Sequence, residues 1–566
     1  MGMPMFGAES EYAVSGINGK GAMRRDDLVN RFVGTARRRL VHLQDTCSPS
    51  GIFLENGARF YIDCGLHPEM ATPERTTPWE LARYIKSGER ILEDLTREVQ
   101  AGFGDAAEIM CFRCNVDYSG SGSTWGCHES YLHRAYPASL PEQLMPHLVT
   151  RVVYTGAGGF NPLVNWPEFC VAPRLMHIEQ VISGDSTGNR GIFHTKNESL
   201  SSNGYNRLHI LCGESLCSET AIVLKFGATA LVVAMAEAGL NPAAEVGLAT
   251  PLDALHTVSS DITCRRELRL AGGGQATAID IQRHLLARAE SNMSVLPPWA
   301  GELCALWRRA LDLLEGVPDS VSTILDWAIK HRLFRDRAAR RGIPFERFPF
   351  LNSLVQRLNN AVAPTPAAGR DIRLSLLAGP SSPIPDERAR VGDALSVHGL
   401  TWSDLESFLK MRDEFYQIDT RFGQIGPRGI FGQLDCRGVL DHGVAGIDGI
   451  AEAMSNPPAV GRARIRGEAI RRLSGQSRAG CSWMGVFGED GRSLDLSDPF
   501  AAKEIWDEPR RPPEHRGEPI PDIPADELFG PEYGRLQHLL DAMRRRYGQS
   551  RTGAQGAPET TEGPNR

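Results

Sequence analysis

Four residues whose types suit catalysis lie close together in the stretch NGARFYIDCGLHPEMATPE, residues 56–74: Arg59, Tyr61, Asp63 and Glu69. In an extended strand, successive side chains point to opposite faces of the sheet. A strand through this stretch places the arginine, the tyrosine and the aspartate on one face and apolar side chains on the other. The alternative is a half-exposed strand with solvated charges. The alternation predicts one face toward a core and one face lining a polar cavity.

Three further predicted strands repeat this pattern of charged or polar side chains on one face. They carry Glu9 and Glu11 in FGAESEYAV, Arg113, Asn115 and Asp117 in RCNVDY, and Arg207 and His209 in NRLHILCGE. Carboxylates gathered in a cleft repel one another unless cations intervene, and Mg²⁺ commonly bridges protein carboxylates to substrate phosphates. Arginine suits phosphate oxygens because its guanidinium offers a planar fork of donors. The pattern therefore points to nucleotide phosphates bound on a sheet.

Two short motifs carry little weight. The glycine-rich stretch at residues 119–131 precedes no recognisable Rossmann unit, and the chain has no GxxxxGK[ST] loop, so a flexible turn is the simpler interpretation. Cys111 and Cys114 form one CxxC, but strand alternation places them on opposite faces and no second CxxC accompanies them. Ordinary buried cysteines are favoured over a zinc or redox site.

The elements that must position these residues are strands interleaved with helices. We expect strands at residues 5–14, 109–118 and 207–212, and helices at 24–43, 77–100, 218–240 and 277–292. The second of these helices opens with Thr77, Pro78 and Glu80, a capping box with proline at the first helical position. These elements predict a mixed α+β fold with a largely antiparallel sheet.

Bulk composition gives no reason to expect a nucleic-acid or membrane partner. The 566 residues include 62 basic and 69 acidic side chains, for a net charge of -7. The apolar segment 220–240 is interrupted by Lys225 and Glu237, which favours a buried core helix over a membrane span. Twelve scattered cysteines fit reduced thiols, and no secretory signal is recognisable at the N-terminus, so we expect a cytoplasmic protein.

A set of longer motifs occurs in a fixed order along the chain: GAESEY, NGARFYIDCGLHPEMAT, NVDYSGSGSTWGCHESY, PHLVTR, YNRLHILCGESLCSET, DWAIKHRL, RIRGEAIRR and DPF. Together they closely resemble the Pup ligase and depupylase family, PafA and Dop, over residues 5–500, with 345–410 poorly matched. That family is related to the carboxylate-amine ligases of the glutamine synthetase type. The resemblance implies a large glutamine-synthetase-like domain, whose curved, largely antiparallel sheet forms the active-site cradle, and a small C-terminal domain.

The expected domain boundaries follow from this resemblance and from local composition. Residues 1–420 form the catalytic domain, with a loop insertion at about 361–394 that is rich in Pro, Ala, Gly and Ser. Residues 421–510 form the small C-terminal domain. Residues 511–566 form a tail rich in Pro and Glu, with one helix and a disordered end.

The resemblance also implies roles for individual residues. The metal ligands are Glu9, Tyr61 and Glu69, the ATP contacts are Arg59, Thr72 and Trp483, the catalytic residue is Asp63, and the possible additional site residues are Glu11, His128, Lys196, Arg207 and His209. The alternatives are core packing for Trp483 and a metal or salt-bridge role for Asp63. In place of the family's NTRDEPHA this chain has HTKNESLS, so Lys196 replaces an arginine and loses the bidentate fork.

The implied activity is ATP- and Mg²⁺-dependent ligation. The C-terminal glutamate side chain of a small Pup-like modifier is activated as an acyl phosphate and joined to a lysine of a target protein. The alternative is a Dop-like depupylase or deamidase, or an ATP-dependent hydrolase or phosphatase on the same scaffold. Residues 13–56 leave no room for the depupylase's extra loop, which favours the ligase. A pseudoenzyme is disfavoured because the chain has all five of the motif residues Glu9, Arg59, Tyr61, Asp63 and Glu69.

Overall fold

The computed structural model describes residues 4–508, except 105–106, 119–120, 165, 317, 363–373, 442–443 and 445, together with His538. The chain divides into two compact units, Met1–Pro509 and Arg510–Arg566, and the first is described below. The predicted tail at 511–566 lies outside the described residues apart from His538.

The main element of the described chain is a 13-stranded sheet. Its strands are β1 (Met5–Glu11), β4 (His42–Asp45), β5 (Ile52–Leu54), β6 (Arg59–Ile62), β7 (Pro68–Ala71), β9 (Cys127–His133), β12 (Gln180–Ser183), β13 (Gly191–His194), β14 (Asn206–Ile210), β17 (Gly480–Cys481), β18 (Gly485–Phe487), β19 (Ser493–Asp495) and β20 (Trp506–Asp507). Their order is β12-β13-β14-β9-β1-β7-β6-β5-β4-β17-β18-β19-β20. Neighbouring strands are antiparallel, except that β12 is parallel to β13 and β17 to β4. The predicted α+β class with a largely antiparallel sheet is confirmed.

Smaller sheets and the helices complete the described part. The other strands are β2 (Ala13–Asn18), β3 (Gly21–Ala22), β8 (Glu108–Phe112), β10 (Gly159–Phe160), β11 (Phe169–Cys170), β15 (Glu267–Arg269) and β16 (Gln275–Thr277). The α-helices are α1 (Arg25–Arg39), α2 (Pro78–Ala101), α3 (Leu140–Thr150), α4 (Val152–Thr155), α5 (Glu219–Glu237), α6 (Pro251–Ser260), α7 (Ala278–Glu290), α8 (Ala300–Gly316), α9 (Asp326–Arg340), α10 (Phe348–Val362), α11 (Leu374–Ala378), α12 (Pro385–Val397), α13 (Trp402–Phe422), α14 (Ile430–Cys436), α15 (Ile450–Ala453) and α16 (Arg462–Leu473). Short 3₁₀ turns lie at η1 (Pro173–His177), η2 (Met293–Val295), η3 (Pro318–Val321) and η4 (Phe345–Arg347).

The largest hydrophobic core lies between α5 and one face of β1, β9 and β14. Phe6, Tyr131 and Leu208 point into this core from the three strands. By length and composition α5 could span a membrane, but 94% of its most apolar window is buried inside the protein. Lys225 in its middle donates to the carbonyls of Cys127 and Glu214 at 3.0 and 2.9 Å. The helix is therefore a core helix, as its interrupted apolar pattern predicts.

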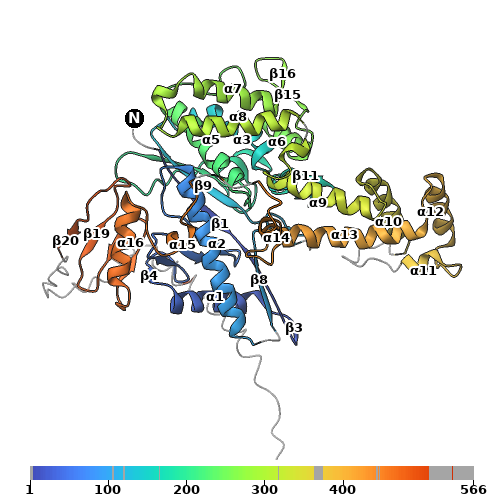
Figure 1. Ribbon diagram of the computed structural model, residues 1–566, viewed down its shortest axis with the longest axis horizontal. Coiled ribbons are helices and arrows are strands. Elements are labelled where there is room, and N and C mark those ends of the chain that lie inside the picture. The colour runs from blue at the N-terminus through green and yellow to red at the C-terminus, as the bar shows by residue number, and fades with distance from the viewer. Residues whose placement is uncertain are drawn as a thin grey trace, which may run out of the picture. The chain divides into compact units, whose positions relative to one another are not determined.

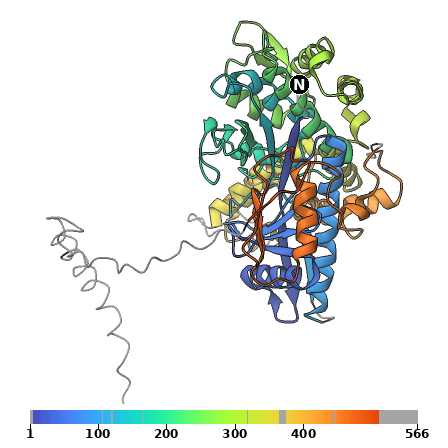
Figure 2. The ribbon, with the colours of Figure 1, turned by 90° about the vertical axis from the view of Figure 1, so that its left-hand side faces the viewer.

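The helices form two groups that have separate hydrophobic cores. In Figure 1, α3, α5, α6, α7 and α8 form a layer at the top, while α10, α12 and α13 extend to the right. The second group has a hydrophobic core of its own, which includes Phe334, Phe348, Phe408 and Phe415. Figure 2 faces α16, which packs against β4, β5 and β18 near the C-terminal end of the described chain.

Two predictions about these elements need correction. Within the predicted loop insertion at 361–394, the described residues include α11 and most of α12, because Pro385 starts a helix whose Val391 is buried in the second core. The predicted strand at 109–118 ends at Phe112.

The early end of that strand takes its three polar side chains out of the predicted cleft face. Arg113 is buried in an ion pair with Glu89 at 2.7 Å, and the side chain of Asn115 bonds the backbone of Ser215. Buried polar groups need partners, and these residues find theirs away from the site. Asp117, beyond the strand, accepts hydrogen bonds from Ser121 instead.

Candidate active site

The polar face of the sheet is built by cross-strand register. In one row, Tyr61 on β6 lies opposite Glu69 on β7, which lies opposite Glu11 on β1. In the next row, Glu9 lies opposite His128 on β9. Directly opposed residues of an antiparallel pair point to the same face. The strands therefore bring residues more than a hundred positions apart onto one surface, opposite the face that packs on α5.

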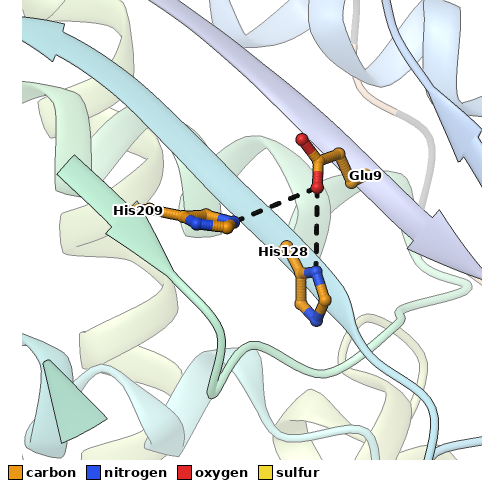
Figure 3. Close-up of side chains that lie close together, drawn as sticks. All are labelled: Glu9, His128 and His209. Atoms are coloured by element: carbon orange, nitrogen blue, oxygen red, sulfur yellow. Dashed lines mark ion pairs between the residues drawn. The ribbon is translucent and has the colours of Figure 1, made fainter. Parts of the chain in front are cut away.

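Glu9 forms the first cluster on this face, with His128 and His209 (Figure 3). Its carboxylate lies 3.8 Å from His128 Nδ1, 3.9 Å from His209 Nε2 and 3.3 Å from an Arg207 guanidinium nitrogen. Burial would raise the pKa of Glu9, but hydrogen bonding to His128 and the charge of Arg207 outweigh it and hold the pKa below its usual range. We call Glu9, His128 and His209 the Glu9–histidine cluster.

His209 completes this cluster as a neutral ring. Burial, and next the charge of Arg207, lower the pKa of His209 to about 2. Both of its ring nitrogens are buried and accept or donate no hydrogen bond within the described protein. A neutral imidazole beside a carboxylate is a suitable ligand for a cation.

The second cluster consists of Glu11, Asp63 and Glu69, which we call the three-carboxylate cluster. One oxygen from each lies within 4.8 Å of the others. Among the described residues, no lysine or arginine lies within ion-pair distance of any of the three. Burial, and next the charges of Glu9 and Glu11, raise the pKa of Glu69 well above its usual value. Oxygen donors without a protein cation fit a hard metal ion such as Mg²⁺.

Tyr61 joins this cluster through its hydroxyl group. It hydrogen-bonds to Glu69, and burial, followed by the charges of Glu9 and Glu69, raises the pKa of Tyr61 well above its usual value. The phenol is therefore neutral in this structure, with one oxygen available to a cation or to a water molecule.

Asp63 follows β6 in a tight turn that also contains a residue not predicted for the site, His67. The backbone N–H of His67 donates to Asp63 Oδ1 at 2.6 Å, and its Nδ1 lies 3.0 Å from Oδ2. A side chain at Gly65 would lie 2.6 Å from the His67 ring, so glycine permits this contact. Leu66 adopts a left-handed φ of 61°, which is unusual for a bulky residue. The turn therefore fixes the Asp63 carboxylate toward the cluster.

A cavity of about 280 Å³ adjoins the Glu9–histidine cluster. Eight of the predicted site residues line it: Glu9, Arg59, Tyr61, Thr72, Lys196, Arg207, His209 and Trp483. The other predicted residues, Glu11, Asp63, Glu69 and His128, do not line it. The cavity and the three-carboxylate cluster thus share the face of one sheet and are separated by Tyr61 and Glu9.

Two predicted ATP contacts have fixed positions beside the cavity. Arg59 donates from Nε to Asp45 at 2.7 Å, and its guanidinium lies 3.9 Å from the centre of the Tyr61 ring. The hydroxyl of Thr72 accepts the backbone N–H of Ala8 at 3.1 Å. Asp45, which the sequence pattern did not indicate, orients the arginine from β4, two strands away in the sheet.

Trp483 forms a wall of the cavity and is half-buried. Its ring packs edge-on against Phe53, with centroids 5.1 Å apart, and the Arg466 guanidinium lies 4.7 Å from its centre. Arg466 in turn pairs with Glu74 at 2.5 Å. The predicted tryptophan is therefore held by an ion pair between α16 and the segment after β7.

Arg462 and Glu74 line the same cavity but were not predicted as site residues. Arg462 donates to Glu74 at 2.6 Å and to the carbonyl of Leu200 at 2.5 Å. Burial would raise the pKa of Glu74, but the charges of Arg466 and then Arg462 lower it to about 2. The available signal was the stretch GRARIRGEAIRR, residues 461–472, in which Arg462 and Arg466 are four positions apart and are both buried on α16.

Lys196, at the departure from the family motif, lies in the segment after β13. Its side chain is about half exposed and pairs with Glu198 at 3.3 Å. It lines the cavity together with Ser199 and Leu200. The substitution therefore lies at this cavity, and Lys196 is not part of the three-carboxylate cluster.

The amino-acid sequence matches the model of a known protein family. The model of the Pup-ligase protein family matches residues 5–354 and 394–487. This chain is a member of the Pup-ligase family. The family resemblance predicted from the motifs is thus confirmed. The unmatched stretch, 355–393, is shorter than the predicted weak region 345–410 and includes α11, most of α12 and part of α10.

Individual relatives and solved structures give the same assignment. The Pup–protein ligases of Mycobacterium avium (strain 104) and Nocardia farcinica (strain IFM 10152) are each 40% identical over 295 residues, which is 50% of this chain and 65% of theirs. The chain thus aligns with somewhat less than two thirds of the length of these relatives.

Two solved structures of a Pup ligase resemble the whole chain more fully. The complex between the prokaryotic ubiquitin-like protein Pup and its ligase PafA matches with a TM-score of 0.67 and 25% identity, over 98% of this chain and 99% of that one. The PafA structure in complex with ADP matches with a TM-score of 0.62 and 26% identity, over 85% and 92%.

Proposed function

We propose that this chain is an ATP- and magnesium-dependent ligase. It joins the side-chain carboxylate of the C-terminal glutamate of a small Pup-like modifier to a lysine of a target protein, through an acyl phosphate. The observation that carries this proposal is the three-carboxylate cluster, which has no lysine or arginine partner among the described residues and shares its sheet face with a cavity lined by arginines and Trp483. Named relatives are Pup–protein ligases, which supports the same reaction here.

The nucleotide fits the cavity through its lining residues. Trp483 offers an aromatic face to the base, and Arg59 and Arg207 offer donors to the phosphates. The ADP complex of a PafA relative supports this use of the cavity. Glu9 and Glu11 on β1, Tyr61 on β6 and Glu69 on β7 would hold magnesium. When bound, the metal would neutralise charge on the phosphates during transfer.

The proposed reaction has two steps. The glutamate side-chain carboxylate attacks the γ-phosphorus of ATP, and ADP leaves, which gives an acyl phosphate. A lysine amine then attacks the acyl carbon, phosphate leaves and an isopeptide bond forms. Arg59 and Arg207 hold the phosphates in place during the first step, and their donors suit the developing negative charge.

Asp63 supplies the base for the second step. A lysine ammonium has an ordinary pKa of about 10.4, so the attacking nitrogen must lose a proton. Burial would raise the pKa of Asp63, but hydrogen bonds from the His67 side chain and backbone lower it, so the carboxylate is ionised at neutral pH. The turn through Gly65 and Leu66 holds it beside Glu11 and Glu69.

The same residues could serve a depupylase, deamidase or hydrolase, and the connection between β1 and β6 favours the ligase. Residues 13–58 are taken up by β2, β3, α1, β4 and β5 with short turns between them. This leaves no place for the additional loop expected of a depupylase. The cavity residues predicted for ATP are present in either case.

The partners we propose are the modifier and lysine-bearing target proteins, with no nucleic acid and no membrane. A cytoplasmic location fits the scattered cysteines, all of which are free thiols in this structure. It also fits the burial of α5 in the core.

Trapping the acyl phosphate tests this function directly. Purified protein is incubated with ATP, Mg²⁺ and Pup ending in glutamate, and hydroxylamine replaces the lysine target. The proposal expects ADP and a modifier hydroxamate in equal amounts, both requiring Mg²⁺. ADP formation without hydroxamate would support the hydrolase alternative, and no turnover of ATP would contradict both.

A further inference from the structure

Arg174 is a buried guanidinium without an acidic partner. It lies in η1, is 2% exposed, and donates from Nη2 to the carbonyl of Leu211 at 3.1 Å. Its Nε and Nη1 are buried and have no hydrogen-bond partner, and within the described chain it forms no ion pair. A buried charge whose donors are unmet is costly, so a ligand that supplies an acceptor would be stabilised there.

This guanidinium lies on the catalytic face of the sheet. Gly126 precedes β9, and alternation places it on the same face as His128. A side chain at Gly126 would lie 2.7 Å from the Arg174 guanidinium carbon, so the arginine occupies the space which that side chain would fill. The backbone N–H of Gly126 donates to Glu11 at 2.6 Å, which puts the three-carboxylate cluster next to Arg174.

A second arginine completes the pair. Arg190, just before β13, donates to the hydroxyl of Thr124 at 2.6 Å and has no ion pair among the described residues. Burial, and next the charge of Arg174, lower the pKa of Arg190 to about 10, while the charges of Glu11 and Glu179 act in the opposite direction. Arg190 at Thr124 and Arg174 at Gly126 therefore lie beside the same short segment before β9.

The position of Arg174 and Arg190 indicates which kind of anion they would bind. Neither arginine lines the cavity assigned to the nucleotide, where Arg59 and Arg207 already serve the phosphates. A C-terminal glutamate has two carboxylates, and only the side-chain one reacts. The other stays anionic, and paired guanidinium groups are its natural donors.

We propose that Arg174 and Arg190 bind the main-chain carboxylate of the modifier's C-terminal glutamate and so select modifiers that end in a free glutamate. This inference rests on the proposed ligase function and specifies how its substrate is recognised. Binding of the terminal carboxylate would direct the side-chain carboxylate toward the three-carboxylate cluster.

The test compares two forms of Pup made by semisynthesis, one with a free C-terminal glutamate and one with a C-terminal glutamate amide. Both keep the reactive side chain. Binding of each form to the full chain is measured by calorimetry with ADP and Mg²⁺ present, for wild type and for Arg190→Gln, Arg174→Lys and the control Arg340→Gln. Arg340 is an exposed residue of α9.

Wild type and Arg340→Gln are expected to bind the free acid at least about tenfold more tightly than the amide, as loss of a charge-assisted hydrogen bond implies. Arg190→Gln should bind both forms equally weakly. Arg174→Lys keeps the charge but loses the fork, so it should retain part of the preference. Because Arg190 is only half-buried, Arg190→Gln is expected to fold, and it keeps the test informative if the Arg174 variant does not fold.

Other results would overturn the proposal. Equal binding of acid and amide by wild type would mean that the arginines only offset the neighbouring carboxylates. If Arg190→Gln still prefers the free acid to the amide but binds ATP about tenfold more weakly, Arg174 and Arg190 would instead be assigned to binding phosphate. Failure of wild type to bind either form, with ATP still bound, would contradict the proposed modifier and this inference together. Binding of the acid form with no hydroxamate in the trapping assay would contradict the ligase function but leave the carboxylate site standing.

Discussion

Two groups of ionisable side chains on the same sheet face differ in how their charge is compensated. In the Glu9–histidine cluster, the carboxylate has Arg207 at 3.3 Å and His128 at 3.8 Å. In the three-carboxylate cluster, His67, the Tyr61 hydroxyl and the backbone of Gly126 supply hydrogen bonds, and no lysine or arginine of the described protein lies within ion-pair distance. The pKa of Glu9 is lowered, whereas that of Glu69 is raised.

The difference shows which group depends on something outside the chain. Glu9 stays ionised with partners supplied by β9 and β14. Glu11, Asp63 and Glu69 repel one another until a cation binds between them. We therefore propose that chemistry which needs magnesium and a lysine ammonium takes place at the three-carboxylate cluster, since the charge of Glu9 in the neighbouring cluster already has a protein partner.

The largest expected effect comes from removing the charge of Asp63. Asp63→Asn keeps the shape but cannot accept the lysine proton, so conjugation should fall by about 10²- to 10⁴-fold, the usual range for a general base. ATP binding measured by calorimetry should stay close to wild type, because Asp63 does not line the cavity.

Two outcomes would reassign Asp63. Conjugation at the wild-type rate would mean that Asp63 is not the base. Loss of nucleotide binding in the same variant would make its role metal-linked or structural. Asp253→Asn, on the distant surface helix α6, is the matched control and should change neither measurement.

Glu74 extends the comparison as a carboxylate fully compensated by arginines. Its lowered pKa stabilises the fold above the ordinary glutamate value of 4.5, and this contribution is lost as pH falls through about 2. Glu74→Gln should therefore reduce the free energy of unfolding at pH 7 by about 3 kcal/mol. Urea unfolding should show the difference from wild type shrinking steadily below pH 4.5.

Glu468→Gln on α16 is the control for this prediction. Its pair with Arg464 is partly exposed, so the change should be less than about 1 kcal/mol. A difference between wild type and Glu74→Gln that does not depend on pH would contradict the ion-pair explanation.

Replacing Trp483 tests whether ATP binds in the cavity beside the two clusters. Trp483→Ala should weaken ATP binding about tenfold through loss of base stacking, at the lower end of the range for aromatic–base contacts. The matched control is Trp506→Ala, because Trp506 packs in the same small core but does not line the cavity. Equal ATP affinity in wild type and Trp483→Ala would assign the ring to core packing.

The smallest effect is on metal-free stability. Glu69→Gln removes one charge from the three-carboxylate cluster, so the metal-free protein at pH 8 should melt roughly 1–3 °C higher. With Mg²⁺ and ATP present the sign should reverse, because the variant loses a ligand. Glu9→Gln should lower the melting temperature in the absence of metal, since it breaks a compensated pair. A higher melting temperature for both metal-free variants would contradict the proposed difference in charge compensation between the two clusters.

Much of the site could be predicted because it depends on strand alternation and on long motifs. The shared face of Arg59 and Tyr61 follows from their alternation with buried Phe60, whereas the register that brings them beside β7 and β1 came from the structure. The same rule failed for Arg113, because nothing in the sequence showed that β8 ends at Phe112.

The parts that could not be predicted are contacts between distant segments. Asp45 reaches Arg59 from another strand, and Arg466 reaches Glu74 across nearly four hundred residues. His67 was visible in the opening stretch, but its contact with Asp63 depends on a turn whose geometry is not encoded in any periodicity. The helices within 361–394 were missed because proline and glycine content favours loops, although buried Val391 and Leu395 recur at helical spacing. The domain boundary at residue 420 stays a prediction, and β17 to β20 extend the main sheet.

The most direct test of the central claim is the intact mass of a lysine-bearing target after incubation with this protein, ATP, Mg²⁺ and Pup ending in glutamate. The account predicts a product with the mass of target plus modifier less one water, joined at a lysine side chain, and formed only when Mg²⁺ is present. Release of phosphate without this product, or cleavage of a preformed isopeptide by the same preparation, would contradict it.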